Sequence, residues 1–171
     1  AHLRQSHPRA RLVIKDQRNL YGIGLDDMLA QLCRAHPALF TPELLGSILM
    51  VTANLNQAQL RVLYGLTDGY VSTYRAEGFN LPVLESLACG TPVVCAGSSS
   101  LPAVAGAGAL LVDPQDTAAL AAALRRVATD AGLRRALVER GHANLGRFSW
   151  AEAAQKVLAV LESAGREESE D

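Results

Sequence analysis

Two glutamates with seven residues between them, Glu77 and Glu85, stand in the stretch YRAEGFNLPVLESLACGTPVV, which runs from Tyr74 to Val94. Gly78 follows the first glutamate, and a glycine lets the backbone turn sharply and approach a ligand closely. Pro82 precedes the second glutamate and favours the first positions of a helix. The spacing therefore predicts one carboxylate before a turn and another about one helical turn beyond it, both able to face one cleft.

This arrangement suits a ligand that carries both hydroxyls and phosphate. Asn80 or Leu81 is expected to cap the helix, whose free N–H groups and dipole attract an anion. Carboxylates do not hold phosphate but accept hydrogen bonds from hydroxyls, as an acidic residue does for ribose in a dinucleotide fold. The pattern predicts a phosphate between two hydroxyl-rich groups, as in a nucleotide sugar. The alternative is an ordinary loop glutamate followed by a glutamate that favours the helix dipole.

Short apolar runs alternate with helical patterns along the chain. Several runs are apolar at successive positions, as strands covered on both faces require. The predicted strands are 11–15, 47–51, 69–73, 92–96 and 108–112, and the predicted helices include 25–34, 57–66 and 82–89, with further helices opening at Asp116, Asp130 and Ser149. This order predicts an α/β fold, a Rossmann-like doubly wound parallel sheet with helices on both faces.

In such sheets, ligands bind outside the carboxyl ends of the strands. The strand 69–73 ends just before Glu77, so the glutamate pair is predicted at that edge. Lys15 ends another strand and could reach a phosphate, or it could be a surface lysine. The chain opens with what resembles a helix end and a turn rather than a strand. We therefore expect a doubly wound domain without its first strand–helix unit.

Composition narrows the function classes. The 171 residues suffice for one domain, and 49% hydrophobic and 19% charged residues are typical of α/β proteins. A net charge of -1 argues against electrostatic binding of nucleic acid. Three widely spaced cysteines fit reduced thiols in a cytoplasmic protein, and no Cys or His pair has metal-ligand spacing. No apolar run approaches the ~20 residues of a transmembrane helix.

The stretch EGFNLPVLESLACGTPVV resembles the acidic signature of retaining GT-B glycosyltransferases of the glycosyltransferase 4 family, also called glycosyl transferases group 1. LRVLYGLTDGYVSTYRAEGF, SSSLPAVAGAGALLVDPQDTAALAAAL and RFSWAEAAQKVL resemble other family blocks, in the same order. The resemblance implies that residues 1–163 are the nucleotide-sugar-binding half of a GT-B fold. Residues 164–171 are expected to be an acidic flexible tail.

The resemblance also implies a hexosyltransferase that needs neither a metal ion nor a cofactor. It would transfer a hexose from a nucleotide diphosphate sugar to an acceptor, with retention. By position, Glu77 would contact the donor sugar as the catalytic residue and Glu85 would bind the ribose hydroxyls. The backbone covering sugar and phosphate would be that of Gly78, Phe79, Asn80 and Leu81. The acceptor domain would lie elsewhere in a longer chain, and this fragment alone would be inactive.

Two alternatives remain at this point: a stand-alone nucleotide-sugar-binding module without catalysis, and another GT-B enzyme such as a nucleotide-sugar epimerase. One departure from the family pattern is Ala103, where many members have glutamate. Phe148 and Trp150 are expected to pack in the core or between domains. The apolar residues of the last helix are expected to lie inside: Val157, Leu158 and Leu161.

Overall fold

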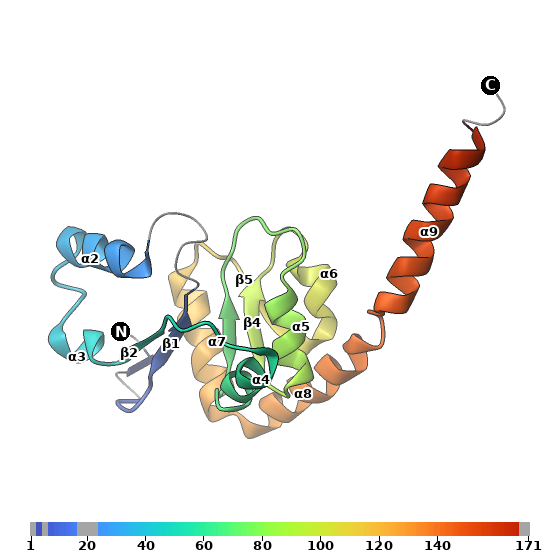
Figure 1. The fold of residues 1–171 in the computed structure, drawn as a ribbon. Coiled ribbons are helices and arrows are strands. Elements are labelled where there is room, and N and C mark those ends of the chain that lie inside the picture. Colours follow the sequence, from blue (N-terminus) through green and yellow to red (C-terminus); the bar gives the residue numbers. More distant parts are fainter. Residues whose placement is uncertain (1–2, 5–6, 17–23, 168–171) are drawn as a thin grey trace. The chain divides into compact units, whose positions relative to one another are not determined.

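The computed structural model of the chain describes residues 3–4, 7–16 and 24–167 (Figure 1). It divides into two compact units, Ala1–Leu63 and Tyr64–Asp171. The division falls inside one helix, α4 (Gln57–Gly65). None of the described helices combines the length and the apolar character needed to cross a membrane.

The first unit contains a pair of parallel strands, β1 (Leu12–Lys15) and β2 (Ile48–Val51). Between them along the chain come α2 (Leu25–Ala35) and α3 (Pro42–Leu45). Among the described residues of this unit, no apolar side chain is fully buried. Both hydrophobic clusters of the structure therefore belong to the second unit.

The second unit contains three parallel strands in the order β3–β4–β5. The strands are β3 (Tyr70–Ser72), β4 (Val93–Ala96) and β5 (Ala109–Val112). The helices are α5 (Leu81–Ala88), α6 (Leu101–Ala105), the 3-10 helix η1 (Gly106–Gly108), α7 (Thr117–Thr129), α8 (Ala131–Leu145) and α9 (Trp150–Glu167).

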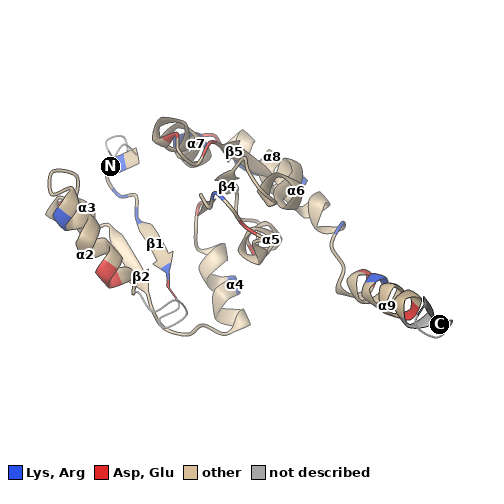
Figure 2. Cartoon of the chain, turned by 90° about the horizontal axis from the view of Figure 1, so that it is seen from above, with Lys and Arg blue, Asp and Glu red and all other residues tan. Residues whose placement is uncertain are grey.

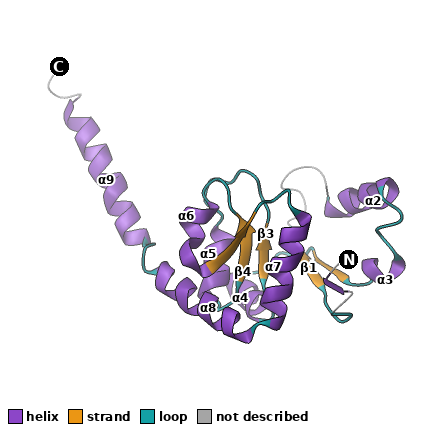
Figure 3. Ribbon diagram, turned by 180° about the vertical axis from the view of Figure 1, so that it is seen from behind, coloured by secondary structure: helices purple, strands orange, loops and turns teal. Residues whose placement is uncertain are grey.

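The central strand β4 is covered by helices on both faces (Figure 3). Val93 and Cys95 pack with buried residues of α5 and α6, and Val94 packs with buried residues of α7 and α8. All four side chains of β4 are 0% exposed. This is the burial that successive apolar residues predict for a parallel strand, and the predicted α/β fold with helices on both faces is confirmed.

Local sequence signals account for the ends of the helices. The carboxylates of Asp116 and Asp130 each accept a backbone N–H three residues on, at 2.8 Å, and so cap α7 and α8 as predicted. Ser149 accepts a backbone N–H in the same way at 3.3 Å, at the start of α9. Just beyond the C-terminus of α5, Gly90 adopts a φ of 71°, which glycine tolerates without strain.

Two features differ from the prediction. The five strands form a pair and a triplet instead of one sheet. The apolar side chains of α9 are exposed rather than inside: Trp150 81%, Val157 59%, Leu158 55% and Leu161 64%. The amphipathic pattern identifies an apolar side, but no described element covers it. α9 carries acidic and basic positions as well (Figure 2) and continues to Glu167, so it extends into 164–171, of which 168–171 lie outside the described residues.

Helix α8 and the 3-10 helix η1 meet backbone to backbone. A Cβ placed on Gly108 would lie 2.6 Å from the Cα of Gly141. A Cβ placed on Gly141 would lie 2.7 Å from a methyl carbon of Leu87, in α5. Glycine at both positions therefore lets α8 approach the rest of the core.

We predict that Gly108→Ala lowers the free energy of unfolding by about 1–3 kcal/mol, because the new methyl group pushes backbone against backbone. Gly65→Ala is the matched control, since a Cβ there meets no atom within 4 Å. Guanidinium unfolding followed by circular dichroism measures both. Equal stability of Gly108→Ala and the natural chain would contradict this packing.

Candidate functional site

Glu77, the first of the predicted glutamates, lies at the carboxyl edge of the three-stranded sheet, whereas Glu85 lies within α5. Residues 73–80 connect the end of β3 to the start of α5 and carry Glu77. Residues 97–100 leave β4 at the same edge. Parallel strands bring their carboxyl ends together, so two loops distant in sequence meet there.

Glu77 is held by its backbone rather than by its side chain. Its carbonyl oxygen accepts hydrogen bonds from the hydroxyls of Ser99 and Ser100, at 2.9 and 2.8 Å. Its N–H donates to Ser99 Oγ at 3.2 Å. Among the described residues, no hydrogen bond reaches its half-buried carboxylate. That carboxylate is therefore available to a ligand, on a backbone that is fixed.

Glu85 is held in the opposite way, by its side chain. The hydroxyl of Tyr64, in the last turn of α4, donates to Glu85 Oε2 at 2.9 Å. The ring of Tyr64 packs edge-on against Tyr70, with centroids 5.9 Å apart. Burial, followed by the hydrogen bond to Glu85, raises the pKa of Tyr64, and burial is also the main cause that raises the pKa of Tyr70 to about 12. Tyr64 is thus a neutral donor at physiological pH and orients the carboxylate.

Sequence reasoning missed Tyr64, for which it predicted only a place in the helix 57–66. Its hydroxyl partner lies 21 residues away in sequence, so no local spacing could connect the two. Two threonine hydroxyls, those of Thr67 and Thr91, donate to the carbonyl oxygen of Tyr64 at 2.8 and 2.7 Å. These bonds fix the backbone from which the tyrosine reaches Glu85.

Asn80 stands at the N-cap of α5, as predicted, but does not cap it with its side chain. It adopts a left-handed conformation with φ 68°, which asparagine tolerates better than most residues. Its Nδ2 donates to Ser72 Oγ at 2.9 Å, and no group of the described residues donates a hydrogen bond to its buried Oδ1. A buried acceptor left unsatisfied costs about 1–3 kcal/mol, so the start of α5 is locally strained.

The first turn of α5 offers fewer free N–H groups than the sequence predicted. Pro82 has no N–H, and the N–H of Val83 already donates to the carbonyl oxygen of Asn80 at 3.0 Å. The N–H of Leu81 and those of the preceding loop are the remaining donors that could face an anion.

Three of the predicted backbone positions are accessible. A Cβ on Gly78 would meet no atom within 4 Å, and Phe79 and Leu81 are 40% and 47% exposed. The Phe79 ring packs edge-on against Phe148, with centroids 5.6 Å apart. Phe148 thus supports the site loop. Trp150 is exposed, which contradicts packing in the core, and its packing between domains stays a prediction.

Lys15 belongs to the first unit. Its ammonium donates to the backbone carbonyl oxygen of Asp16 at 2.6 Å. Its use as a phosphate ligand stays a prediction. Within the residues that the structure describes, no group of three or more His, Cys, Asp or Glu side chains could hold a metal ion.

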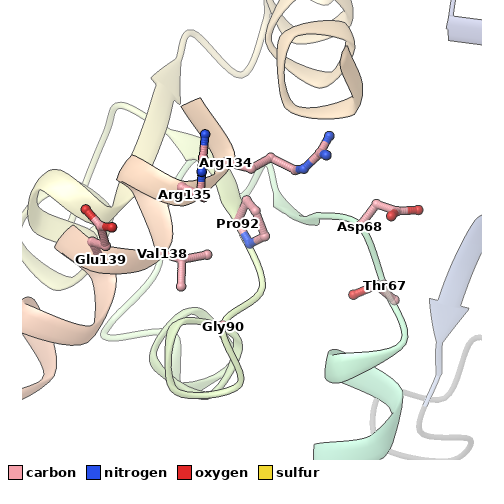
Figure 4. Close-up of a pocket in the computed structure, with 8 residues that line it drawn as sticks. All are labelled: Thr67, Asp68, Gly90, Pro92, Arg134, Arg135, Val138 and Glu139. Atoms are coloured by element: carbon pink, nitrogen blue, oxygen red, sulfur yellow. The ribbon is translucent and has the colours of Figure 1, made fainter. Parts of the chain in front are cut away.

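Two hollows mark opposite edges of the three-stranded sheet. One, of about 640 Å³, lies beyond the carboxyl ends of β4 and β5 and is lined by Arg75, Ser98 and Asp113, among others. The other, of about 390 Å³, lies at the amino ends of β3 and β4, between α8 and Thr67–Asp68 (Figure 4). Ligands of parallel α/β sheets bind at the carboxyl ends, which favours the edge with Glu77, although neither Glu77 nor Glu85 lines the hollow there.

Arg134, which lines the hollow at the amino edge, has a structural role. Arg134 Nη1 donates to the carbonyl oxygens of Val127 and Ala128, both at 3.0 Å. The guanidinium therefore caps the C-terminus of α7, where a cation also opposes the helix dipole.

The sequence profile of the family described as Glycosyl transferases group 1 matches residues 1–144. The chain belongs to this family. It is 40% identical over 91 residues to the O-antigen chain mannosyltransferase B of Escherichia coli, covering 53% of this chain and 24% of that protein. It is 42% identical over 109 residues to the D-inositol 3-phosphate glycosyltransferase of Acidothermus cellulolyticus, covering 57% of this chain and 24% of that protein. The family predicted from the sequence is confirmed.

The chain spans about a quarter of the length of these curated relatives. Its structure resembles the alpha,alpha-trehalose 6-phosphate synthase of Burkholderia multivorans, with a TM-score of 0.79 at 20% identity, covering 98% of this chain and 38% of that one. At this identity the likeness concerns the fold, and it supports a Rossmann-like domain of the GT-B kind.

We predict that Tyr64→Phe lowers the free energy of unfolding by about 1–3 kcal/mol, because a hydrogen bond to a charged group is lost. Tyr74→Phe, at a ring that is 62% exposed, should change stability little. Urea unfolding at several pH values measures both variants.

The contribution of Tyr64 to the free energy of unfolding should fall as the pH rises. Since folding raises the pKa of Tyr64 above the unfolded value of 10, its contribution is full below about pH 10 and is lost above it. The stability difference between the natural chain and Tyr64→Phe should be constant from about pH 7 to 9 and shrink above pH 10. A difference that grows above pH 10 would contradict the assignment.

Proposed function

We propose that this chain is the nucleotide-sugar-binding domain of a retaining, metal-independent glycosyltransferase that transfers a hexose from a nucleotide diphosphate sugar to an acceptor. One observation carries the proposal. In a chain of the group 1 family, Glu77 presents a carboxylate without a partner among the described residues, beside the accessible Gly78, at the carboxyl edge of a parallel sheet.

The two glutamates would divide the donor between them. Glu85, oriented by Tyr64, accepts hydrogen bonds from the ribose hydroxyls, and Glu77 contacts the sugar. The N–H groups between Gly78 and Leu81, with the positive end of α5 behind them, face the sugar and the diphosphate. Lys15 is a further candidate for the phosphate. No metal ion or cofactor takes part in this arrangement.

The strand order supports the proposal that residues 1–163 form this domain without its first strand–helix unit. A doubly wound sheet has the order 3-2-1-4-5-6, in which strand 1 stands between strands 2 and 4. A chain that lacks strand 1 would divide into a pair and a triplet, as the described strands do. The unburied apolar residues of the first unit, such as Leu12 and Leu49 at 50% and 49% exposed, agree with this reading.

In this proposal the acceptor domain lies elsewhere in the full-length chain, and the present fragment transfers no sugar by itself. Holding an acceptor against the donor supplies a large part of the barrier reduction in group transfer. The free thiols of Cys33, Cys89 and Cys95 fit the cytoplasmic location that belongs to the proposal.

A stand-alone sugar-nucleotide-binding module and a nucleotide-sugar epimerase are the competing functions. The names of the relatives, a mannosyltransferase and an inositol phosphate glycosyltransferase, favour transfer of a hexose. Product analysis of the full-length chain with GDP-mannose or UDP-glucose separates them: transfer forms a glycoside, epimerisation changes the free sugar nucleotide, and a binding module changes nothing.

We predict that Glu85→Gln weakens binding of both the nucleoside diphosphate and the sugar nucleotide by one to two orders of magnitude. The reason is that a hydrogen bond to a charged group contributes about 1.5–3 kcal/mol, and about 1.4 kcal/mol is a factor of ten. Glu77→Gln should weaken only the sugar nucleotide. Calorimetric titration of the full-length chain with UDP against UDP-glucose, and GDP against GDP-mannose, measures both.

Equal losses of nucleoside diphosphate affinity in the two variants would show that the roles are wrongly assigned. Unchanged affinity in every titration would show that neither glutamate binds the donor, and that one is an ordinary loop charge and the other a charge that favours the helix dipole.

We also predict that EDTA leaves donor binding unchanged, because helix N–H groups and basic side chains supply the positive field. The same titrations with and without EDTA provide the measurement. Loss of binding in EDTA that Mg²⁺ or Mn²⁺ restores would exclude the metal-independent mechanism.

A further inference from the structure

Three consecutive serine hydroxyls, from Ser98 to Ser100, bind the backbone of the loop that carries Glu77. Ser98 Oγ donates to the carbonyl oxygen of Arg75 at 3.2 Å. Ser99 and Ser100 both donate to the carbonyl oxygen of Glu77, and the Glu77 N–H donates back to Ser99 Oγ. Both polar groups of the Glu77 backbone are thereby occupied, so a ligand at Glu77 meets its side chain.

These serines depart from what their local structure favours. Ser100 stands at the N-cap of α6, where a hydroxyl usually accepts an N–H of the helix, yet it makes no capping bond and donates to Glu77 instead. Ser99 adopts a φ of 56°, a left-handed conformation that costs a serine stability.

The strained positions cluster around one residue. Among the described residues, the non-glycine positions with positive φ are Asn80 and Ser99. Asn80 follows Glu77 by three residues, and Ser99 is bonded to it. Local conflicts of this kind are expected where a site requires them.

We propose that Ser99 and Ser100 are positioning residues that hold the backbone of Glu77 so that its carboxylate meets the donor sugar, without touching the donor themselves. The proposal rests on the proposed function of Glu77. Gly78 follows Glu77 directly, and a glycine adds backbone freedom. Hydrogen bonds that fix the Glu77 backbone before binding reduce the entropy lost when the sugar arrives.

The test compares Ser99→Gly and Ser100→Ala with Thr129→Ala, a control that removes an exposed hydroxyl bonded to the backbone carbonyl of Arg125 at the end of α7. Each full-length variant is titrated with UDP and UDP-glucose, and with GDP and GDP-mannose. We expect Ser99→Gly and Ser100→Ala to bind the sugar nucleotide about 2- to 10-fold more weakly, a loss equal to the net contribution of one hydrogen bond. Their affinity for the nucleoside diphosphate should equal that of the natural chain. Thr129→Ala should change neither affinity.

Two further readouts distinguish positioning from a structural role. Ser99→Gly relieves the left-handed strain but loses two hydrogen bonds to Glu77, so its thermal stability should change little while its sugar-nucleotide affinity falls. In a Glu77→Gln background the serine substitutions should cause no additional loss, because they act through that carboxylate. Ser100→Thr keeps the hydroxyl and should restore most of the affinity.

Hydrogen exchange tests the contact without any donor. The amide of Glu77 should exchange faster in Ser99→Gly than in the natural chain, and its exchange should be unchanged in Thr129→Ala. Unchanged exchange in Ser99→Gly would overturn the proposal. If Glu77→Gln weakens sugar-nucleotide binding but neither serine substitution does, this proposal alone is overturned. If Glu77→Gln leaves sugar-nucleotide binding unchanged, both the proposed function and this inference are overturned. Equal losses for nucleoside diphosphate and sugar nucleotide would also overturn the positioning role.

Discussion

The burial of β4 on both faces is the constraint on which the candidate site depends. A strand with no exposed side chain needs helices on each side, and it pairs in parallel with β3 and β5. Those pairings bring three carboxyl ends to one edge. The loops that leave β3 and β4 then lie together, which is why Ser99 and Glu77, 22 residues apart in sequence, share hydrogen bonds.

The placement of α5 follows from the same core. Val83 and Leu87 are buried on one side of the helix, and Leu87 lies against Gly141 of α8, where an added Cβ would lie 2.7 Å from its methyl carbon. Glu85 stands between these two anchors in sequence and faces another direction, toward Tyr64. Apolar packing on one face of α5 thus decides where a carboxylate on its other side points.

The parts of the structure that sequence predicted are those with local causes. Asp116 and Asp130 cap their helices by accepting the backbone N–H three residues further along, so each cap and its partner lie within one helical turn. A buried strand is recognised from its own continuous apolar run. The exposed apolar side of α9 was predicted as buried because periodicity reveals an apolar face but not what covers it. The contact of Tyr64 joins two helices and those of Ser99 join two loops, and each pair is more than 20 residues apart in sequence, so spacing along the chain does not predict them.

The two glutamates differ in which part of the residue is held, and this difference fits the proposed division of labour. Glu85 is fixed at its carboxylate by Tyr64, so its acceptor geometry is set before any ligand arrives. That suits ribose hydroxyls, which take no part in the transfer. Glu77 is fixed at its backbone by serines, and among the described residues no hydrogen bond holds its carboxylate. A carboxylate that meets the transferred sugar must accommodate a changing charge and geometry as the bond to the leaving diphosphate breaks. Anchoring the backbone while leaving the side chain unpaired satisfies both requirements: the group is in place, and it can adjust.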